Sequence, residues 1–135
     1  MKTKPVLEFS DVQRIAAAAV DEAMRNGWAV CIAIVDDGGH PMHLQRLDGA
    51  AATTPYIATS KAQTAALGRR ESKIFEDIIN GGRTSCLSAP VLQGMLEGGV
   101  PIMVDGQCIG AVGVSGVKST EDAQVAKAGI AALGR

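Results

Sequence analysis

Aromatic side chains are scarce in this sequence: Phe, Tyr and Trp together make up 3% of its 135 residues. A folded core must therefore be built from Ala, Val, Ile and Leu, which the hydrophobic content of 47% allows. Proteins that bind nucleic acids stack bases on aromatic rings and neutralise phosphates with clustered cations. With a net charge of -1 and no basic run longer than Arg69-Arg70, this chain is expected to bind no nucleic acid.

Long apolar runs are also missing. None approaches the roughly 20 residues that cross a bilayer, so we expect no membrane contact. The first residues, MKTKPVLEF, place a proline and a glutamate where a secretory signal needs an apolar run, so we expect a cytoplasmic protein. The length fits a single domain over residues 1–135, with residues 1–6 expected to be disordered.

The three cysteines are isolated from one another. Cys31, Cys86 and Cys108 form no CxxC pair and no zinc-type spacing, so we expect three free thiols. Cys31 and Cys108 lie in strand-like runs and are interpreted as small core residues. Cys86 lies in a polar loop, where its reactivity is worth testing.

The first fifty residues have the pattern of a helix followed by a hairpin. A capping box at Ser10 and a left-handed cap at Gly27 bound the helix. The run WAVCIAIV, residues 28–35, predicts a buried strand, and the Asp and Gly residues after it predict a turn. Pro41 is tolerated at the first residue of an edge strand, so the second strand is placed at an edge of the sheet.

The rest of the chain predicts two helices, a loop, a second hairpin and a last helix. The helices cover residues 56–69 and 71–79, and the loop contains one short strand around residues 91–95. Asp105-Gly106 joins two strand-like runs, and the acidic stretch from Ser119 caps the last helix. This order predicts an α+β layered domain in which helices flank an antiparallel sheet.

Both histidines lie in VDDGGHPMHLQRLDGA, residues 35–50. On an extended chain, His40 and His43 lie roughly 10 Å apart on opposite faces, so we do not expect them to hold one metal ion together. His40 is either a turn-capping or solvent-facing residue or a ligand-binding one. His43 is either part of a pocket wall or an ordinary strand residue. Either imidazole is suited to act as a haem axial ligand or as an acid/base group.

Arg46 and Lys61 are cations in apolar surroundings. Each is either a long stem on an apolar surface with its charge in water, or an anchor for a ligand carboxylate. For Arg46 a third interpretation is an ion pair with Asp48 that orders the hairpin.

The run GVSG, residues 113–116, is neither a phosphate loop nor a nucleophile elbow, because the spacing of its glycines fits neither motif. Ser115 is therefore interpreted as a small residue in a tight turn. Gly110, Gly113 and Gly116 indicate close approach by a ligand or by another backbone segment.

Two paired signatures, RLDGA with KAQTAA and GGVPI with GAVGVSG and a following ED, together closely resemble those of the GlcG/HbpS family. This family is related to the carboxy-terminal domain of PduO, and the resemblance covers residues 7 to 133. It implies a profilin-like or Roadblock-like fold and homo-oligomers. It also implies a small-molecule ligand, because several members bind haem and some are linked to haem or iron sensing, cobalamin metabolism or catabolic operons. The candidate ligand-binding residues are His40, His43, Arg46, Lys61, Gly98, Gly99, Gly113 and Ser115.

The middle of the chain departs from the family pattern. LGRRESK and GGRTSCLSA stand where relatives often have a Gly-x-Pro-Ser/Thr step and a Gly-Pro-Leu-Tyr-Gly loop, and His43 stands where many have a small apolar residue. Such changes at the mouth of a pocket indicate an altered choice of ligand.

Three functions stay open. The first is haem or tetrapyrrole binding, with His40 or His43 as axial ligand and Arg46 and Lys61 near the propionates. The second is a lyase, isomerase or hydrolase that anchors a carboxylated intermediate on these cations, with His43 or Glu97 moving a proton. The third is a homo-oligomeric assembly protein without a small ligand.

Overall fold

The computed structural model describes residues 1–134, and its elements follow the order that the sequence predicts. They are α1 (Phe9–Arg25), β1 (Cys31–Asp36), β2 (Pro41–Arg46), α2 (Thr54–Gly68), α3 (Ser72–Asn80), the 3-10 helix η1 (Thr84–Ser88), β3 (Gly99–Val104), β4 (Gln107–Ser115) and α4 (Ser119–Ala131).

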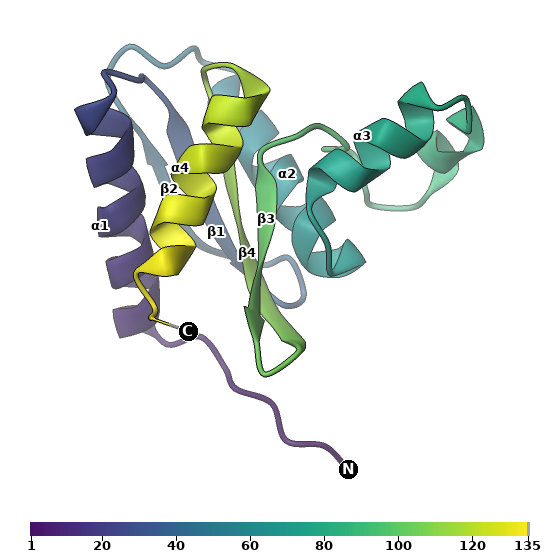
Figure 1. Cartoon of the computed structure of the whole chain (residues 1–135), viewed down its shortest axis with the longest axis horizontal. Coiled ribbons are helices and arrows are strands. Elements are labelled where there is room, and N and C mark those ends of the chain that lie inside the picture. Colours follow the sequence, from purple (N-terminus) through teal and green to yellow (C-terminus); the bar gives the residue numbers. More distant parts are fainter. Residues whose placement is uncertain (135) are drawn as a thin grey trace.

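One antiparallel sheet, with strand order β2-β1-β4-β3, separates two helical layers (Figure 1). Helices α1 and α4 pack together on one face, and α2 lies across the other face, mainly over β4. Helix α3 and η1 extend away from this body, on the right of Figure 1. The predicted α+β fold, with helices on both faces of an antiparallel sheet, is confirmed.

The two faces of the sheet carry different cores. Ile32 and Ile34 of β1 belong to a cluster of larger aliphatic side chains with α1 and α4. Cys31 and Ala33, on the other face, pack against the alanines of α2. These small side chains let α2 lie so close that a Cβ added at Gly113 would overlap the carbonyl oxygen of Ala58. The close approach that Gly113 indicates is therefore made by a helix backbone.

The first helix begins earlier than predicted. The backbone N–H of Glu8 donates to the Asp11 carboxylate at 2.9 Å, so the capping box starts at Glu8, and the box predicted at Ser10 is wrong. Gly27, with φ +71, ends the helix region in the left-handed conformation as expected. Strand β1 begins at Cys31, three residues later than the predicted run.

Strand β2 lies at an edge of the sheet and begins at Pro41, as the proline predicts. Its pairing with β1 shifts at one place: Ile34 pairs with His43, but Val35 pairs with Pro41. Met42 has no partner in this register and lines a hollow on the side of Leu7. The run MHLQR suggests that Met42 shares a face with Leu44 and Arg46, but this register shift is a bulge that breaks the alternation.

The strand predicted around residues 91–95 is wrong. Val91 has φ +71, which an extended strand does not allow, and the backbone of Gly94 lies directly against that of Ser60. Met95 is buried, with its sulfur 3.7 Å from the Cys86 sulfur. This segment is therefore an irregular connection that packs on α2 and η1.

The second hairpin and the last helix have the predicted local signals. Asp105 and Gly106 both have positive φ, 51 and 76, as a two-residue hairpin turn requires. The Glu121 carboxylate accepts the N–H of Lys118 at 3.2 Å and caps α4. Within residues 1–134, no helix is long and apolar enough to cross a membrane. Residues 1–6, where we expected disorder, have neither helix nor strand in the structure.

Candidate functional site

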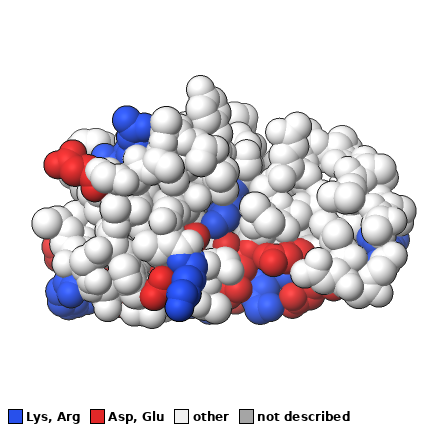
Figure 2. Space-filling view, turned by 90° about the horizontal axis from the view of Figure 1, so that it is seen from above, with Lys and Arg blue, Asp and Glu red and all other residues white. Residues whose placement is uncertain are grey.

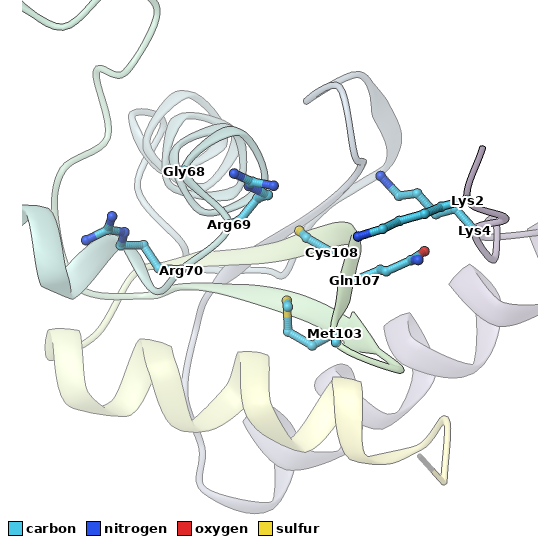
Figure 3. Close-up of a pocket in the computed structure, with 9 residues that line it drawn as sticks. Lys2, Lys4, Gly68, Arg69, Arg70, Met103, Gln107 and Cys108 are labelled. Atoms are coloured by element: carbon cyan, nitrogen blue, oxygen red, sulfur yellow. The ribbon is translucent and has the colours of Figure 1, made fainter.

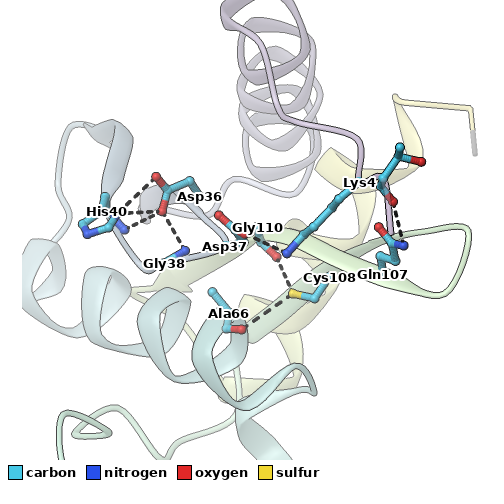
Figure 4. A network of polar contacts seen from close by, with 10 residues as sticks. Lys4, Asp36, Asp37, Gly38, His40, Ala66, Gln107, Cys108 and Gly110 are labelled. Carbon is cyan, nitrogen blue, oxygen red and sulfur yellow. Dashed lines mark hydrogen bonds and ion pairs between the residues drawn. The ribbon is translucent and has the colours of Figure 1, made fainter. Parts of the chain in front are cut away.

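The turn between β1 and β2 is folded around the side chain of Asp36. One oxygen of its carboxylate accepts the backbone N–H of Gly38 and that of His40, each at 2.9 Å. The same oxygen lies 3.1 Å from Nδ1 of the His40 ring (Figure 4). Asp36 therefore fixes both the backbone of the turn and the direction of the imidazole.

These contacts change the acidity of Asp36. Burial disfavours its charged form, but the N–H groups of His40 and Gly38 and the His40 ring outweigh that cost and lower the pKa of the Asp36 carboxyl. Asp36 is therefore a carboxylate over a wide range of pH, and it remains able to accept the Nδ1–H of His40.

The His40 ring is held with one nitrogen free. Its Nδ1 faces Asp36, and no group within residues 1–134 contacts Nε2, on a side chain that is 78% exposed. A Cβ at Gly38 would lie 2.7 Å from Cε1 of this ring, so the ring position requires glycine there. Metal-binding histidines are commonly oriented in this way, by a carboxylate on the second ring nitrogen.

His43 has different surroundings. It is half-buried, its Nε2 lies 3.3 Å from the side-chain oxygen of Gln45, and it pairs with Ile34 on the face of α1 and α4. No interaction joins the two imidazoles in the described part of the chain. Nor do residues 1–134 contain three His, Cys, Asp or Glu side chains arranged to hold a metal ion.

Lys61 is buried in an ion pair within the protein. Its ammonium lies 3.1 Å from the Asp122 carboxylate and 3.0 Å from the carbonyl oxygen of Val114, and both charged side chains are at most 4% exposed. Burial raises the pKa of Asp122, and the nearby Lys61 ammonium offsets part of that rise. The interpretation with the Lys61 charge in water is wrong, and the carboxylate that it meets belongs to α4.

The glycines of the candidate set pack around this ion pair. A Cβ at Gly98 would lie 2.8 Å from the Lys61 ammonium, and one at Gly99 would overlap the Lys61 backbone. Gly98, Gly99 and Gly113 therefore lie at a buried junction between α2, α4 and the end of β4. Ser115 is the last residue of β4 and lies at the same junction. Asp122 was missed as a partner because its place in the first turn of α4 marked it only as a capping residue.

The remaining candidates lie elsewhere. Arg46 is exposed opposite Cys31, and among residues 1–134 it forms no ion pair with Asp48. Glu97 lies before β3, where its N–H donates to the Glu76 carboxylate at 2.7 Å. Because β2 and β3 are the two outer strands of the sheet, His43 and Glu97 are not brought together.

The layered fold and its histidine-bearing hairpin define an α+β domain of the HbpS type. The crystal structure of HbpS superposes with a TM-score of 0.89 at 29% identity, covering 100% of this chain and 95% of that one. The family model described as "Haem degrading protein HbpS-like" matches residues 7–131, and the chain belongs to this family. The family resemblance drawn from the sequence is thereby confirmed.

Two further relatives are similar over most of their length. Protein GlcG of Escherichia coli strain K12 is 54% identical over 115 residues, which is 85% of each chain. The structure of the PduOC:haem complex superposes with a TM-score of 0.86 at 29% identity and 95% coverage of both chains. That relative binds haem, as the name of its complex states.

Proposed function

We propose that this protein binds haem and that His40 is the axial ligand. The observation that carries the proposal is the contact between Asp36 and His40, which directs Nδ1 toward a carboxylate and leaves the exposed Nε2 without a partner among the described residues. Haem iron bound by histidine needs this free nitrogen, and a carboxylate on the other nitrogen increases the basicity of the ligand. Family membership and the haem complex of PduOC support the same ligand.

The surroundings of the turn fit the rest of the group. Haem needs apolar contacts for its ring and cations for its propionates. Leu44 of β2 and Leu67 of α2 are 53% and 40% exposed, and Leu67 lies beside Gly39 in the turn. Arg46, on the same face of β2 as Leu44, has no protein ion pair in residues 1–134. When bound, haem would supply a redox-active iron that the side chains themselves lack.

Titration with hemin tests the proposal. We expect a saturable Soret shift that His40→Ala abolishes and His43→Ala leaves in place, because Nε2 of His43 already faces Gln45. If His43→Ala abolishes the Soret shift and His40→Ala does not, the axial ligand would instead be His43 of β2. A shift no larger than that of hemin on a control protein would overturn haem binding.

Assembly into homo-oligomers is a second part of the proposal. Helix α3, η1 and the connection to β3, residues 72–97, form an arm in which α3 buries only Ser72. Ile74, Leu87, Val91 and Leu96 of this arm are large apolar side chains that remain exposed. Figure 2 shows the right-hand part of the molecule with an upper surface of uncharged residues and a group of acidic and basic residues below it. Exposed apolar side chains of this kind are stabilised when a second copy of the chain covers them.

Light scattering tests the assembly. We expect an oligomer at micromolar concentration and dissociation on the double substitution Ile74→Asp with Leu87→Asp. The matched control is Lys73→Asp, an exposed change on the same helix. A monomeric wild-type protein would overturn this part.

The free state of Cys31, Cys86 and Cys108 supports a reducing compartment, and we place the protein in the cytoplasm on that ground.

A further inference from the structure

A cavity of about 630 Å³ lies where the N-terminal segment passes the end of α2 and the β3-β4 hairpin (Figure 3). Lys2 and Lys4 reach into it from one side and Arg69 from the other, while Met103 and Cys108 form its floor on the hairpin. Its volume is in the range of small-molecule sites. Neither histidine lines it, so it is distinct from the proposed haem site.

The charge of this cavity is positive. Its lining contains four cations and no Asp or Glu, although Arg70 turns away from the centre and stacks on Phe75 at 5.4 Å. Lys4 is paired with Asp37 at 2.7 Å, at the rim. Among residues 1–134, Lys2 and Arg69 form no ion pair with a carboxylate. Three converging cations therefore face one carboxylate, which leaves an excess of two positive charges.

The fold positions Arg69 and Lys4. Arg69 follows α2 with φ 56, in the left-handed conformation where glycine is favoured, so an arginine is placed at a position that costs backbone strain. The amide of Gln107 donates to the Thr3 carbonyl at 3.0 Å and, with the Lys4 pair, fastens the N-terminal segment over the cavity. Figure 4 shows these contacts beside those of the Cys108 sulfur with Gly110 and Ala66.

The floor of the cavity adds no negative charge. Burial raises the pKa of the Cys108 thiol, whose sulfur contacts the carbonyl oxygens of Gly110 at 3.3 Å and Ala66 at 3.7 Å. The thiol is therefore neutral and does not repel an anion. Met103, which is partly exposed beside it, offers apolar contact to a short carbon chain.

We propose that this cavity is a second binding site, for a small organic dianion such as a dicarboxylate or a phosphate monoester. The guanidinium of Arg69 would bind one charged group by two parallel hydrogen bonds, and the ammonium groups of Lys2 and Lys4 would bind the other. The match of two ligand charges to the excess of two protein charges favours a dianion over a monoanion such as acetate.

Isothermal titration of the whole chain tests the site, with succinate and inorganic phosphate as dianion probes and acetate as the monoanion. We expect saturable binding of one or both dianions, weakened about tenfold by Arg69→Gln or by Lys2→Gln, because each removes a charge-assisted contact. Both side chains are exposed at the surface, so the fold should be kept, which circular dichroism checks. The preferred probe then identifies a carboxylate or a phosphoryl ligand.

Two control variants make the result specific. Arg83→Gln removes an exposed cation on the arm outside the cavity and should leave the affinity unchanged. His40→Ala should also leave it unchanged, so that failure of haem binding and failure of this site are seen separately. Binding of neither dianion, equal binding of acetate, or an equal loss with Arg83→Gln would overturn the proposal.

Discussion

The ammonium of Lys61 lies 3.1 Å from the carboxylate of Asp122, and this pair joins α2 on one face of the sheet to α4 on the other. Asp122 also accepts the N–H of Val117 at 3.1 Å, so it holds the turn between β4 and α4 as well. A cation that the sequence presents as a ligand anchor therefore fastens the two layers of the domain together.

Removing one member of this pair should be strongly destabilising. Lys61→Met leaves a buried carboxylate without its cation, and we expect a loss of about 3–5 kcal/mol in the free energy of unfolding, measured by urea denaturation. The double variant Lys61→Met with Asp122→Leu should recover part of that loss. Lys127→Met, which breaks the exposed pair with Glu71, is the control and should cost less than about 1 kcal/mol. A double variant less stable than the single one would contradict this account.

Gly113→Ala tests the packing of α2 on the sheet. The new methyl group would overlap the Ala58 carbonyl and press on Ala62, so the helix must move, at an expected cost of about 3 kcal/mol in thermal or urea unfolding. Gly27→Ala is the comparison, because a Cβ there meets no atom within 4 Å and only its φ of +71 opposes the change. That variant should lose about 1 kcal/mol. Equal losses would mean that α2 shifts without strain.

The lowered pKa of Asp36 makes stability depend on pH in a defined direction. Folding favours the charged carboxylate, so its contribution is fully present above the ordinary aspartate pKa of about 3.9 and is lost as the pH falls below it. The side chain is 37% exposed, which limits the contribution to less than about 1 kcal/mol. In Asp36→Asn, the free energy of unfolding, measured by urea denaturation at several pH values, should fall less steeply toward acid pH than in the wild type. A steeper fall in the variant would refute the assignment.

Asp36 should also act on haem affinity as a positioning residue. Asp36→Asn removes the carboxylate that directs Nδ1 of His40, and we expect hemin affinity to fall about tenfold with the Soret position largely kept. Asp37→Asn, in the same turn, loses the pair with Lys4 but no contact to His40, so its affinity should stay within twofold of the wild type by our estimate. Similar losses in both variants would assign the effect to the turn as a whole.

Local patterns predicted the fold well where neighbouring residues decide the structure. The hairpin at Asp105-Gly106, the cap at Gly27 and the edge strand at Pro41 each depend on the conformations open to one or two residues. The strand predicted near Val91 failed because burial of Met95 against Cys86 and contact of Gly94 with α2 decide that segment. Those contacts join residues that are distant in the sequence.

The candidate site was harder to predict for the same reason. The sequence places Lys61 in an apolar helix but cannot show that Asp122, 61 positions later, lies beside it. It likewise gives no sign that Lys2 and Arg69 face the same cavity. By contrast, Asp36 and His40 are four residues apart around two glycines, so the sequence already placed them in one turn, although it left the role of His40 open and did not single out Asp36.

Both outer strands of the sheet carry a proline, Pro41 in β2 and Pro101 in β3. A proline has no N–H to offer, so each open border of the sheet has a gap in the row of donors that an added strand would need. Growth of the sheet from one molecule into the next is therefore disfavoured at either border. Association of copies of this chain through side chains on their helices and loops is thereby favoured over growth of a continuous sheet.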